Sequence, residues 1–528
     1  MVFDKVYDFI VLGGGSAGCV LAARLSENPD ARVLLVERGR GMSSATRIPA
    51  MWPTLLDGAE SWPGGTVEQA AVGATVRWPR GRGLGGSSGI NGMIFARGHR
   101  SRYDQWPSLG ARGWGYDDLL PYFRRTERVS HGDPTVRGDA GPMTVAPASP
   151  GHPVALAGLA AATEAGYPMA ADIGSGLDIG FGRPDLTIVD GERLSAADAY
   201  LAPALTRTNL DIATNALVHS VCVVNGRAVG VKFTIADTLF MVGCVEEVVL
   251  TAGAVGSAAI LLRSGIGPAR HLQELGIDIV ANIAGVGENL HDHPLSGITY
   301  RSHEPLADST NNHGEVIGVL SSDEGPSPDL QFTVGSVPVH RPSQHGPPHG
   351  YTIMVGLMTP YSRGVLRLSS ADPESPPLLD PRYLVESDDR TALTTGLHLA
   401  RCLGEAEAFQ PWRAEEALPG IGTGNDLSRY LRQSMSTCYD YVGTCHMGID
   451  DISVVDPDLR VHGISRLRVA DASVIPSIPS ANIYATVLAI AERAAEFISG
   501  RQPCHGAAQS SRQSHGDGVT PTQCERSP

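Results

Sequence analysis

Three glycines near the start of the chain limit most strongly what it can fold into. They stand in the pattern Gly13-x-Gly15-x-x-Gly18, directly after a short apolar run. This is the spacing with which a strand turns into a helix around a dinucleotide pyrophosphate. Gly13 permits the tight turn, Gly15 lets the backbone approach the phosphates, and Gly18 allows the helix to pack closely on the strand.

The residues on either side of the glycines complete a strand–helix–strand unit. Their apolar spacing predicts a strand over 7–12, a small-residue helix over 16–25 and a second strand over 33–37. The helix begins at Ser16, where free N–H groups and the positive end of the helix dipole would face the phosphates. Glu37 ends the second strand and is placed to accept hydrogen bonds from a ribose diol. The unit predicts a dinucleotide site and leaves FAD and NAD open.

Length and charge narrow the class of protein. The chain has 528 residues, which is long for one hydrophobic core and favours two domains. Its net charge of −15 argues against a nucleic-acid partner, because phosphate contacts need a basic face. No apolar stretch reaches the roughly 20 residues that span a bilayer, and the first apolar run lacks a signal-peptide cleavage site. We therefore expect a cytoplasmic protein without a membrane partner.

The rest of the chain predicts further sheet and helix elements. Apolar patterns indicate strands over 210–214, 220–224, 231–235, 247–251 and 467–470, and helices over 257–264 and 485–498. Asn225-Gly226 predicts a hairpin turn. Residues 501–528 are rich in Gln, Ser and His and are expected to form a disordered tail. The eight cysteines lack metal-ligand spacing, so we expect buried or incidental thiols and no metal site.

Four motifs resemble the glucose–methanol–choline (GMC) oxidoreductase family. They are GRGLGGSSGIN at 81–91 with FARG at 95–98, GAVGS to SGIG between 253 and 267, VGENLHDH at 286–293, and DAS at 471–473 followed by Pro476. The second motif departs mildly from the family at Ala258. The resemblance covers essentially 7–500 and is nearest to bacterial oxidases and dehydrogenases of aromatic primary alcohols.

The resemblance implies an α/β fold, with a Rossmann-like FAD-binding domain and a second sheet-based (α+β) substrate domain. We expect the first domain to comprise 1–150, 205–300 and 452–500, and the second to comprise 151–204 and 301–451.

The resemblance also implies which residues contact FAD. They are Gly13, Gly15, Ser16, Gly18, Glu37, Gly86, Ser87, Asn91, Val218 and Asp471. Among these, Asn91 is implied to reach the flavin edge. Some members attach FAD covalently through a histidine just before this asparagine, but this chain has Ile90 there. Attachment at that site is excluded, and non-covalent FAD is expected.

The family's catalytic pair is replaced in this chain. Flavin-dependent oxidation of an alcohol needs a hydroxyl proton to be removed, and a neutral imidazole suits that task. The family places this histidine three residues before Gly-Thr, and this sequence has Asp440 before Gly443-Thr444. Counting back along the last helix puts Tyr484 at the second position, where the family has His or Asn.

Three interpretations of the replacement remain open. In the first, Asp440 is the base. A tyrosine would then donate a hydrogen bond to the substrate oxygen, from Tyr439, Tyr441 or Tyr484. In the second, His446 supplies a displaced imidazole at a position where the family more often has arginine. In the third, the flavin site has lost alcohol oxidation. The first interpretation meets a difficulty, because a carboxylate beside a reduced flavin adds negative charge, and desolvation raises its pKa.

Other candidates are interpreted structurally. His293 is expected to close a turn, and Phe332, His340, Tyr351 and Met354 suit a sheet core as well as a substrate site.

We expect FAD-dependent oxidation of a small or mid-sized primary alcohol, including aromatic ones, by hydride transfer to flavin N5. The partner is a small-molecule substrate, and the electron acceptor is left open between oxygen and another acceptor. The alternative is a flavoprotein of the same ancestry that catalyses a non-redox reaction, as a lyase, isomerase or cyclase.

Overall fold

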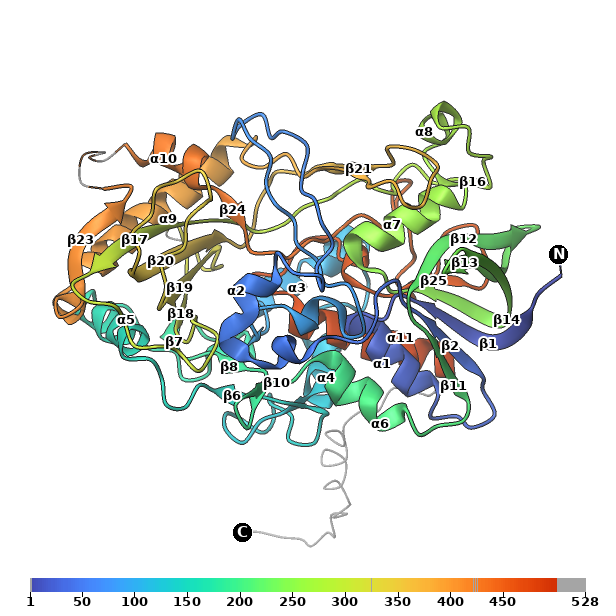
Figure 1. Ribbon diagram of the computed structural model, residues 1–528, viewed down its shortest axis with the longest axis horizontal. Coiled ribbons are helices and arrows are strands. Elements are labelled where there is room, and N and C mark those ends of the chain that lie inside the picture. The colour runs from blue at the N-terminus through green and yellow to red at the C-terminus, as the bar shows by residue number, and fades with distance from the viewer. Residues whose placement is uncertain (1, 324, 421, 423, 425, 501–528) are drawn as a thin grey trace, which may run out of the picture.

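The protein is described by a computed structural model that covers residues 2–323, 325–420, 422, 424 and 426–500. It is elongated, with one seven-stranded sheet toward each end and a band of loops and short helices between them (Figure 1). The tail predicted over 501–528 lies outside the described residues. Among those residues, none of the helices is both long enough and apolar enough to cross a membrane.

The sheet nearer the N-terminus has a parallel centre. β1 (Lys5–Leu12) lies between β2 (Val33–Val36) and β14 (Thr238–Leu250) and pairs with both in parallel. The other strands are β11 (Leu210–Ala213), β12 (Ala216–Val224), β13 (Arg227–Ile235) and β25 (Leu467–Val469). The strand order is β11-β2-β1-β14-β13-β12, and β25 pairs with β14. This is the open, helix-covered sheet expected of a dinucleotide-binding domain.

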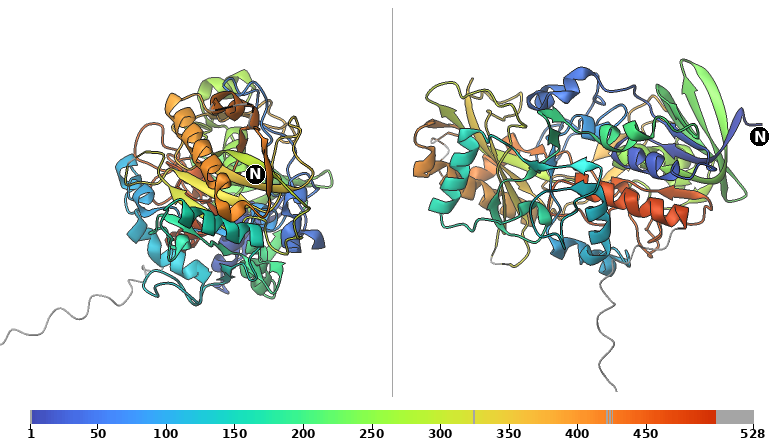
Figure 2. Two further views of the ribbon diagram at one scale, coloured as in Figure 1. Left: turned by 90° about the vertical axis from the view of Figure 1, so that its left-hand side faces the viewer. Right: turned by 90° about the horizontal axis from the view of Figure 1, so that it is seen from below.

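Helices with small side chains pack closely on this sheet. α1 (Ser16–Leu25) contacts β1 and β2 and is built largely from Ala, Gly, Val and Leu. α11 (Tyr484–Ser499) lies alongside α1 (Figure 2). α7 (Gly253–Arg263) contacts β12. The predicted strand–helix–strand unit at the start of the chain is confirmed.

The structure extends the predicted hairpin region by a further turn. Asn225 and Gly226 adopt φ angles of 50° and 70°, as the predicted hairpin requires. A second turn follows at Ala236 and Asp237, with φ angles of 45° and 66°, and joins β13 to β14. The sequence prediction started the latter strand only at residue 247, because Ala-Asp lacks the glycine that marks such turns.

The second sheet is mainly antiparallel. Its strands are β7 (Gly180–Gly182), β17 (Pro294–Ser302), β18 (Ile317–Leu320), β19 (Leu330–Gly335), β20 (Gly350–Leu357), β23 (Arg413–Leu418) and β24 (Ser436–Thr437). The order is β23-β17-β20-β19-β18-β7, and β24 pairs with β17. α9 (Ser387–Glu405) packs on β17, β19 and β20, and α5 (Pro153–Glu164) packs on β19.

The two faces of the second sheet have different neighbours. Phe332 and Tyr351 are fully buried, and Tyr351 stacks on Phe409 with ring centroids 4.8 Å apart. Gln331 is next to Phe332 in β19 and therefore points to the opposite face. There it lies opposite Gly356 and donates a hydrogen bond to Asn482, two residues before α11. Phe332 and Tyr351 are thus core residues, whereas Gln331 faces the first sheet's side of the molecule.

Shorter elements complete the described chain. The remaining helices are α2 (Trp52–Leu55), α3 (Arg100–Tyr103), α4 (Tyr116–Thr126), α6 (Ala202–Ala204), α8 (Ala269–Glu274) and α10 (Leu427–Ser434). The remaining strands are β3 (Ile94–Phe95), β4 (Glu127–Arg128), β5 (Met143–Thr144), β6 (Ala146–Pro147), β8 (Asp185–Leu186), β9 (Ile188–Val189), β10 (Glu192–Arg193), β15 (Ile266–Gly267), β16 (Ala281–Asn282), β21 (Val365–Arg367) and β22 (Leu378–Asp380).

Candidate active site

The turn between β1 and α1 requires glycine for steric reasons. Gly13 has a φ of +113°, and a Cβ there would lie 2.6 Å from the carbonyl oxygen of Thr251. A Cβ on Gly18 would overlap the carbonyl oxygen of Gly13. The tight turn and the close helix packing predicted from the sequence therefore have a direct cause in backbone contacts.

The N-terminus of α1 is open toward an anionic group. Gly15 is the N-cap, and within the described chain no side chain caps the helix and no acid stands in its first turn, which begins at Ser16. The glycine-rich loop approaches so closely that a Cβ on Gly86 would lie 2.7 Å from Gly15 Cα. A Cβ on Gly15 itself would have no neighbour nearer than 3.9 Å. Free N–H groups beside open space fit the pyrophosphate of FAD.

Glu37 is buried beside this turn. Its Oε2 accepts a hydrogen bond from Gly14 N at 2.7 Å, and its Oε1 accepts one from Gly39 N at 2.8 Å. Burial raises the pKa of the Glu37 carboxyl, whereas these backbone donors lower it. Each carboxylate oxygen has a second lone pair, so the side chain can still accept a ribose hydroxyl. Its position therefore fits the role predicted from the sequence.

The side chain of Asn91 has a protein partner that the sequence did not indicate. Its Oδ1 accepts hydrogen bonds from Arg193 Nη1 at 2.7 Å and from Met93 N at 3.1 Å. Arg193 is buried, and desolvation lowers its pKa to about 10. This arginine fixes the orientation of the Asn91 amide, so that the Nδ2 end is the one left to face a cofactor. No sequence motif pointed to Arg193.

The other residues expected to contact FAD differ in the hydrogen bonds that their side chains already make within the protein. Asp471 is buried, and its carboxylate accepts hydrogen bonds from Gly253 N at 2.9 Å, Ser257 Oγ at 2.5 Å and Ser473 N at 2.8 Å. It therefore ties the start of α7 to the C-terminal segment. Val218 lies in β12, and Ser87 Oγ accepts a hydrogen bond from Gly81 N at 3.1 Å.

Asp440 lies buried among donors from several segments. Ile483 N donates to its Oδ1 at 3.2 Å, and Asn482 Nδ2 donates to its Oδ2 at 3.3 Å. His293 Nδ1 lies 3.0 Å from the same Oδ2. Three groups therefore converge on one carboxylate at the N-terminal end of α11.

Contacts of the next residues hold Asp440 near the expected cofactor. Tyr441 stacks on Trp78, with ring centroids 3.9 Å apart, just before the glycine-rich loop. Further along, Cys445 N donates to Ser473 O at 2.9 Å, in the segment implied to contact FAD. The motif around Asp440 thus lies against the segment that leads into the glycine-rich loop and against the C-terminal segment implied to contact FAD.

Tyr484 does not take part in this cluster. It begins α11, but its hydroxyl lies 3.8 Å from Met143 Sδ, and its ring packs edge-on against Phe95. Burial raises the pKa of the Tyr484 hydroxyl. The polar side chain near Asp440 is that of Asn482, two positions earlier. Counting along the helix gave the position in the sequence and could not give the direction of the side chain.

His446 also points elsewhere. It is buried, and its Nδ1 has no hydrogen-bond partner among the described residues. Burial lowers its pKa, and the charged group that acts on it most is Asp450 in the following loop. The described contacts of Asp440 do not include His446, which therefore does not supply the displaced imidazole through a direct contact.

His293 supplies an imidazole that sequence reasoning assigned to turn closure. Its side chain is fully buried, and Nε2 lies 3.0 Å from the carbonyl oxygen of Pro479. Next to it, Asp292 accepts a hydrogen bond from Asp440 N at 2.8 Å, and burial raises the pKa of Asp292 to about 6. The VGENLHDH motif was visible in the sequence, but its contact with Asp440 spans 147 positions.

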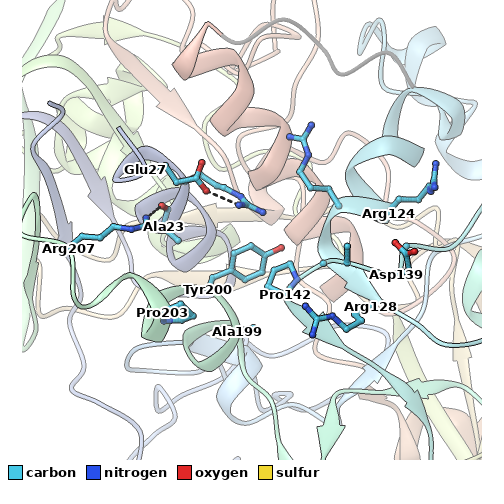
Figure 3. Close-up of a pocket in the computed structure, with 15 residues that line it drawn as sticks. Ala23, Glu27, Arg124, Arg128, Asp139, Pro142, Ala199, Tyr200, Pro203 and Arg207 are labelled. Carbon is cyan, nitrogen blue, oxygen red and sulfur yellow. Dashed lines mark hydrogen bonds and ion pairs between the residues drawn. The ribbon is translucent and has the colours of Figure 1, made fainter. Parts of the chain in front are cut away.

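A separate cavity of about 470 Å³ lies near α1 and α4 (Figure 3). Five arginines line it, namely Arg24, Arg124, Arg125, Arg128 and Arg207. Two of them are paired with buried acids of α11, Arg24 with Glu492 and Arg125 with Glu496. None of the residues predicted for cofactor binding or catalysis lines this cavity.

Known proteins share the whole architecture. Residues 7–295 and 360–491 match the N- and C-terminal family models of GMC oxidoreductases. Human mitochondrial choline dehydrogenase is 37% identical, over 94% of this chain and 90% of its own. Oxygen-dependent choline dehydrogenase of Brucella suis biovar 1 is 35% identical, over 94% and 96%. The crystal structure of pyridoxine 4-oxidase from Mesorbium loti superimposes with a TM-score of 0.90 at 35% identity, covering 93% of this chain and 98% of that one.

The ranges matched by the family models contain every motif described above, from the Gly13 turn to the DAS segment. The matches agree with the fit of the open end of α1 to a pyrophosphate. The chain therefore belongs to the GMC oxidoreductase family, and it is an FAD-dependent oxidoreductase that acts on CH–OH donors.

Proposed function

We propose that the enzyme oxidises a small or mid-sized primary alcohol and that Asp440 accepts the hydroxyl proton. The observation that carries this proposal is the buried carboxylate of Asp440 at the family's histidine position, with Asn482 and Ile483 N donating to it. A positioned side chain that accepts a proton typically contributes about 10²–10⁴ in rate. The names of the relatives, choline dehydrogenase and pyridoxine 4-oxidase, support an alcohol substrate.

The chain's own residues would hold the cofactor and orient the alcohol. When bound, FAD supplies the two-electron acceptor for the hydride of the alcohol carbon. Gly13, Gly15, Ser16 and Gly18 would hold its pyrophosphate, and Glu37 its ribose. Further FAD contacts are proposed for Gly86, Ser87, Asn91, Val218 and Asp471. FAD is held without a covalent bond at the family's histidine site, because that site carries Ile90.

The second sheet supplies the substrate side of the site. Gln331 is buried, and its Nε2 donates to Asn482 Oδ1 at 3.2 Å, which links the sheet to Asp440. Its Oε1 is buried and has no hydrogen-bond partner among the described residues. A substrate with a second hydrogen-bond donor would pair with this oxygen. Leaving a buried amide oxygen without a partner costs about 1–3 kcal/mol.

The two sheets also support a division into two domains. The FAD-binding domain comprises 1–150, 205–300 and 452–500, and the substrate domain comprises 151–204 and 301–451. β17 crosses the boundary at residue 300.

Anaerobic mixing with a panel of primary alcohols tests the proposed reaction. The oxidised flavin absorbance should bleach with at least one alcohol, because hydride transfer needs no oxygen. Asp440→Asn should bind FAD normally and slow the bleaching by about 10²-fold or more. Asp450→Asn makes the same change on an exposed loop and should react like the unmodified enzyme. Absence of bleaching with every alcohol would oppose the reaction, and full activity of Asp440→Asn would remove Asp440 as the base.

A further inference from the structure

We propose that His293 is a positioning residue for this reaction and that it forms an imidazolium–carboxylate pair with Asp440. The proposal rests on the function proposed above, because it concerns the same base. The motif around Asp440 lacks the family's histidine. His293, the residue before β17, supplies an imidazole to the site in its place.

The hydrogen bonds of His293 determine how many protons the pair holds. Nε2 lies 3.0 Å from the carbonyl oxygen of Pro479, which can only accept, so Nε2 carries a hydrogen. Nδ1 lies 3.0 Å from Asp440 Oδ2, so a hydrogen must also lie between these two atoms. Without it, two acceptors would face each other in a buried place, which is unfavourable. The pair therefore holds one proton more than a neutral imidazole with an ionised carboxylate.

The other partners of Asp440 favour that proton on the imidazole. Asn482 Nδ2 donates to Oδ2, and Ile483 N donates to Oδ1. Several N–H donors stabilise the charged form of a carboxylate. The His293 side chain is fully buried, and the ionised Asp440 gives the buried imidazolium its counter-charge.

The neighbouring titratable groups do not replace His293 as the charged partner of Asp440. His291 has its Nδ1 2.6 Å from Asn289 O and accepts from Ile478 N through Nε2, so it holds one ring hydrogen and is neutral. Burial lowers its pKa far below the usual value. Asp292 accepts from Asp440 N and from the hydroxyls of Thr437 and Tyr383. Desolvation raises the pKa of the half-buried Cys438 thiol, which is therefore neutral.

The pair removes the charge difficulty of a carboxylate at this position. Oxidation of R–CH₂–OH breaks one C–H and one O–H bond and yields the aldehyde. The hydride, with both electrons of the C–H bond, would be accepted by FAD, and Asp440 would take the hydroxyl proton. The pair then changes from neutral to +1, which offsets the negative charge that arrives with the hydride. A lone carboxylate would instead leave one uncompensated negative charge before and after the step.

Nitrogen NMR of the holoenzyme with ¹⁵N-labelled histidine tests the protonation state directly. The His293 resonances, identified by their loss in His293→Gln, should show hydrogen on both ring nitrogens. In Asp440→Asn the same ring should lose its Nδ1 hydrogen, because the counter-charge is gone. A neutral His293 ring in the unmodified enzyme would overturn the proposal even if alcohols still bleach the flavin.

Flavin reduction and the flavin midpoint potential give the second measurement. His293→Gln should lower the potential and slow anaerobic reduction by about 10²-fold, because the positive charge is lost. The exchange Asp440→His with His293→Asp retains the pair in reverse and should restore reduction relative to either single change. His291→Gln alters another buried hydrogen-bonded histidine and should leave the potential unchanged. An unchanged potential in His293→Gln would contradict the charge role of His293.

Discussion

The turn from β1 to α1 and the junction around Asp440 both adjoin the expected cofactor, yet different contacts hold them. In the turn, Gly18 meets Gly13 within a few positions and Gly14 N reaches Glu37 after 23, although Gly13 also lies against Thr251. At the junction, Asp440 is contacted by His293, 147 positions away, and by Asn482, 42 positions away. The first region follows its motif, whereas the second has lost the motif's histidine.

The difference shows how a lost motif residue can be replaced. The steric requirement at Gly18 allows no substitute, because its clash with the Gly13 carbonyl lies within the same few residues. A proton-holding group can come from another segment, provided that the tertiary structure brings it within hydrogen-bond distance of the replacement. Asp440 alone suggests a damaged site, whereas Asp440 with His293 retains both a carboxylate and an imidazole.

The largest effect is expected in the turn. Gly18→Ala would drive a methyl group into the Gly13 carbonyl, so FAD content should fall to near zero and the fold should be strongly destabilised. Flavin absorbance per protein and thermal unfolding measure both. Gly41→Ala is the matched control, because a Cβ there meets nothing within 4 Å. Normal flavin content in Gly18→Ala would break the claim that this turn tolerates no substitute.

The next effect concerns Asp292 at the junction. Burial raises its pKa from 3.8 to about 6, so its ionisation opposes folding. The stability that its protonated form contributes is full below pH 3.8 and is lost as the pH rises through about 6. Relative to Asp292→Asn, the free energy of unfolding should fall by about 2 kcal/mol between pH 4 and 7. Denaturant unfolding of both proteins checks this, and parallel pH curves would contradict it.

The smallest effects separate the residues that contact Asp440 from those that do not. Asn482→Ala removes a donor to Asp440 and should slow flavin reduction about 10-fold, which matches one hydrogen bond to a charged group. Tyr484→Phe and His446→Gln should change the rate by less than about 2-fold, because neither side chain has a described hydrogen bond to Asp440. Stopped-flow reduction measures all three. If Tyr484→Phe greatly slowed flavin reduction and Asn482→Ala did not, Tyr484 would be assigned to the active site instead of Asn482.

The local sequence was sufficient to predict the structure wherever backbone geometry determines it. The glycine spacing predicted the turn, the helix over 16–25 and the place of Glu37, because each depends on residues close in the chain. The same holds for the Asn225-Gly226 hairpin, whereas the Ala236-Asp237 turn lacked a glycine and was missed. Motif spacing also located Asp440 as the residue in the histidine position.

Only the tertiary structure decided which side chains contact Asp440. The sequence put Tyr484 at the second position, but the side chain turns toward Met143, and Asn482 points to Asp440 instead. The sequence likewise could not reveal that His293 lies 3.0 Å from the carboxylate. Spacing along a chain determines backbone position, whereas the direction of a buried side chain depends on the packing of distant segments.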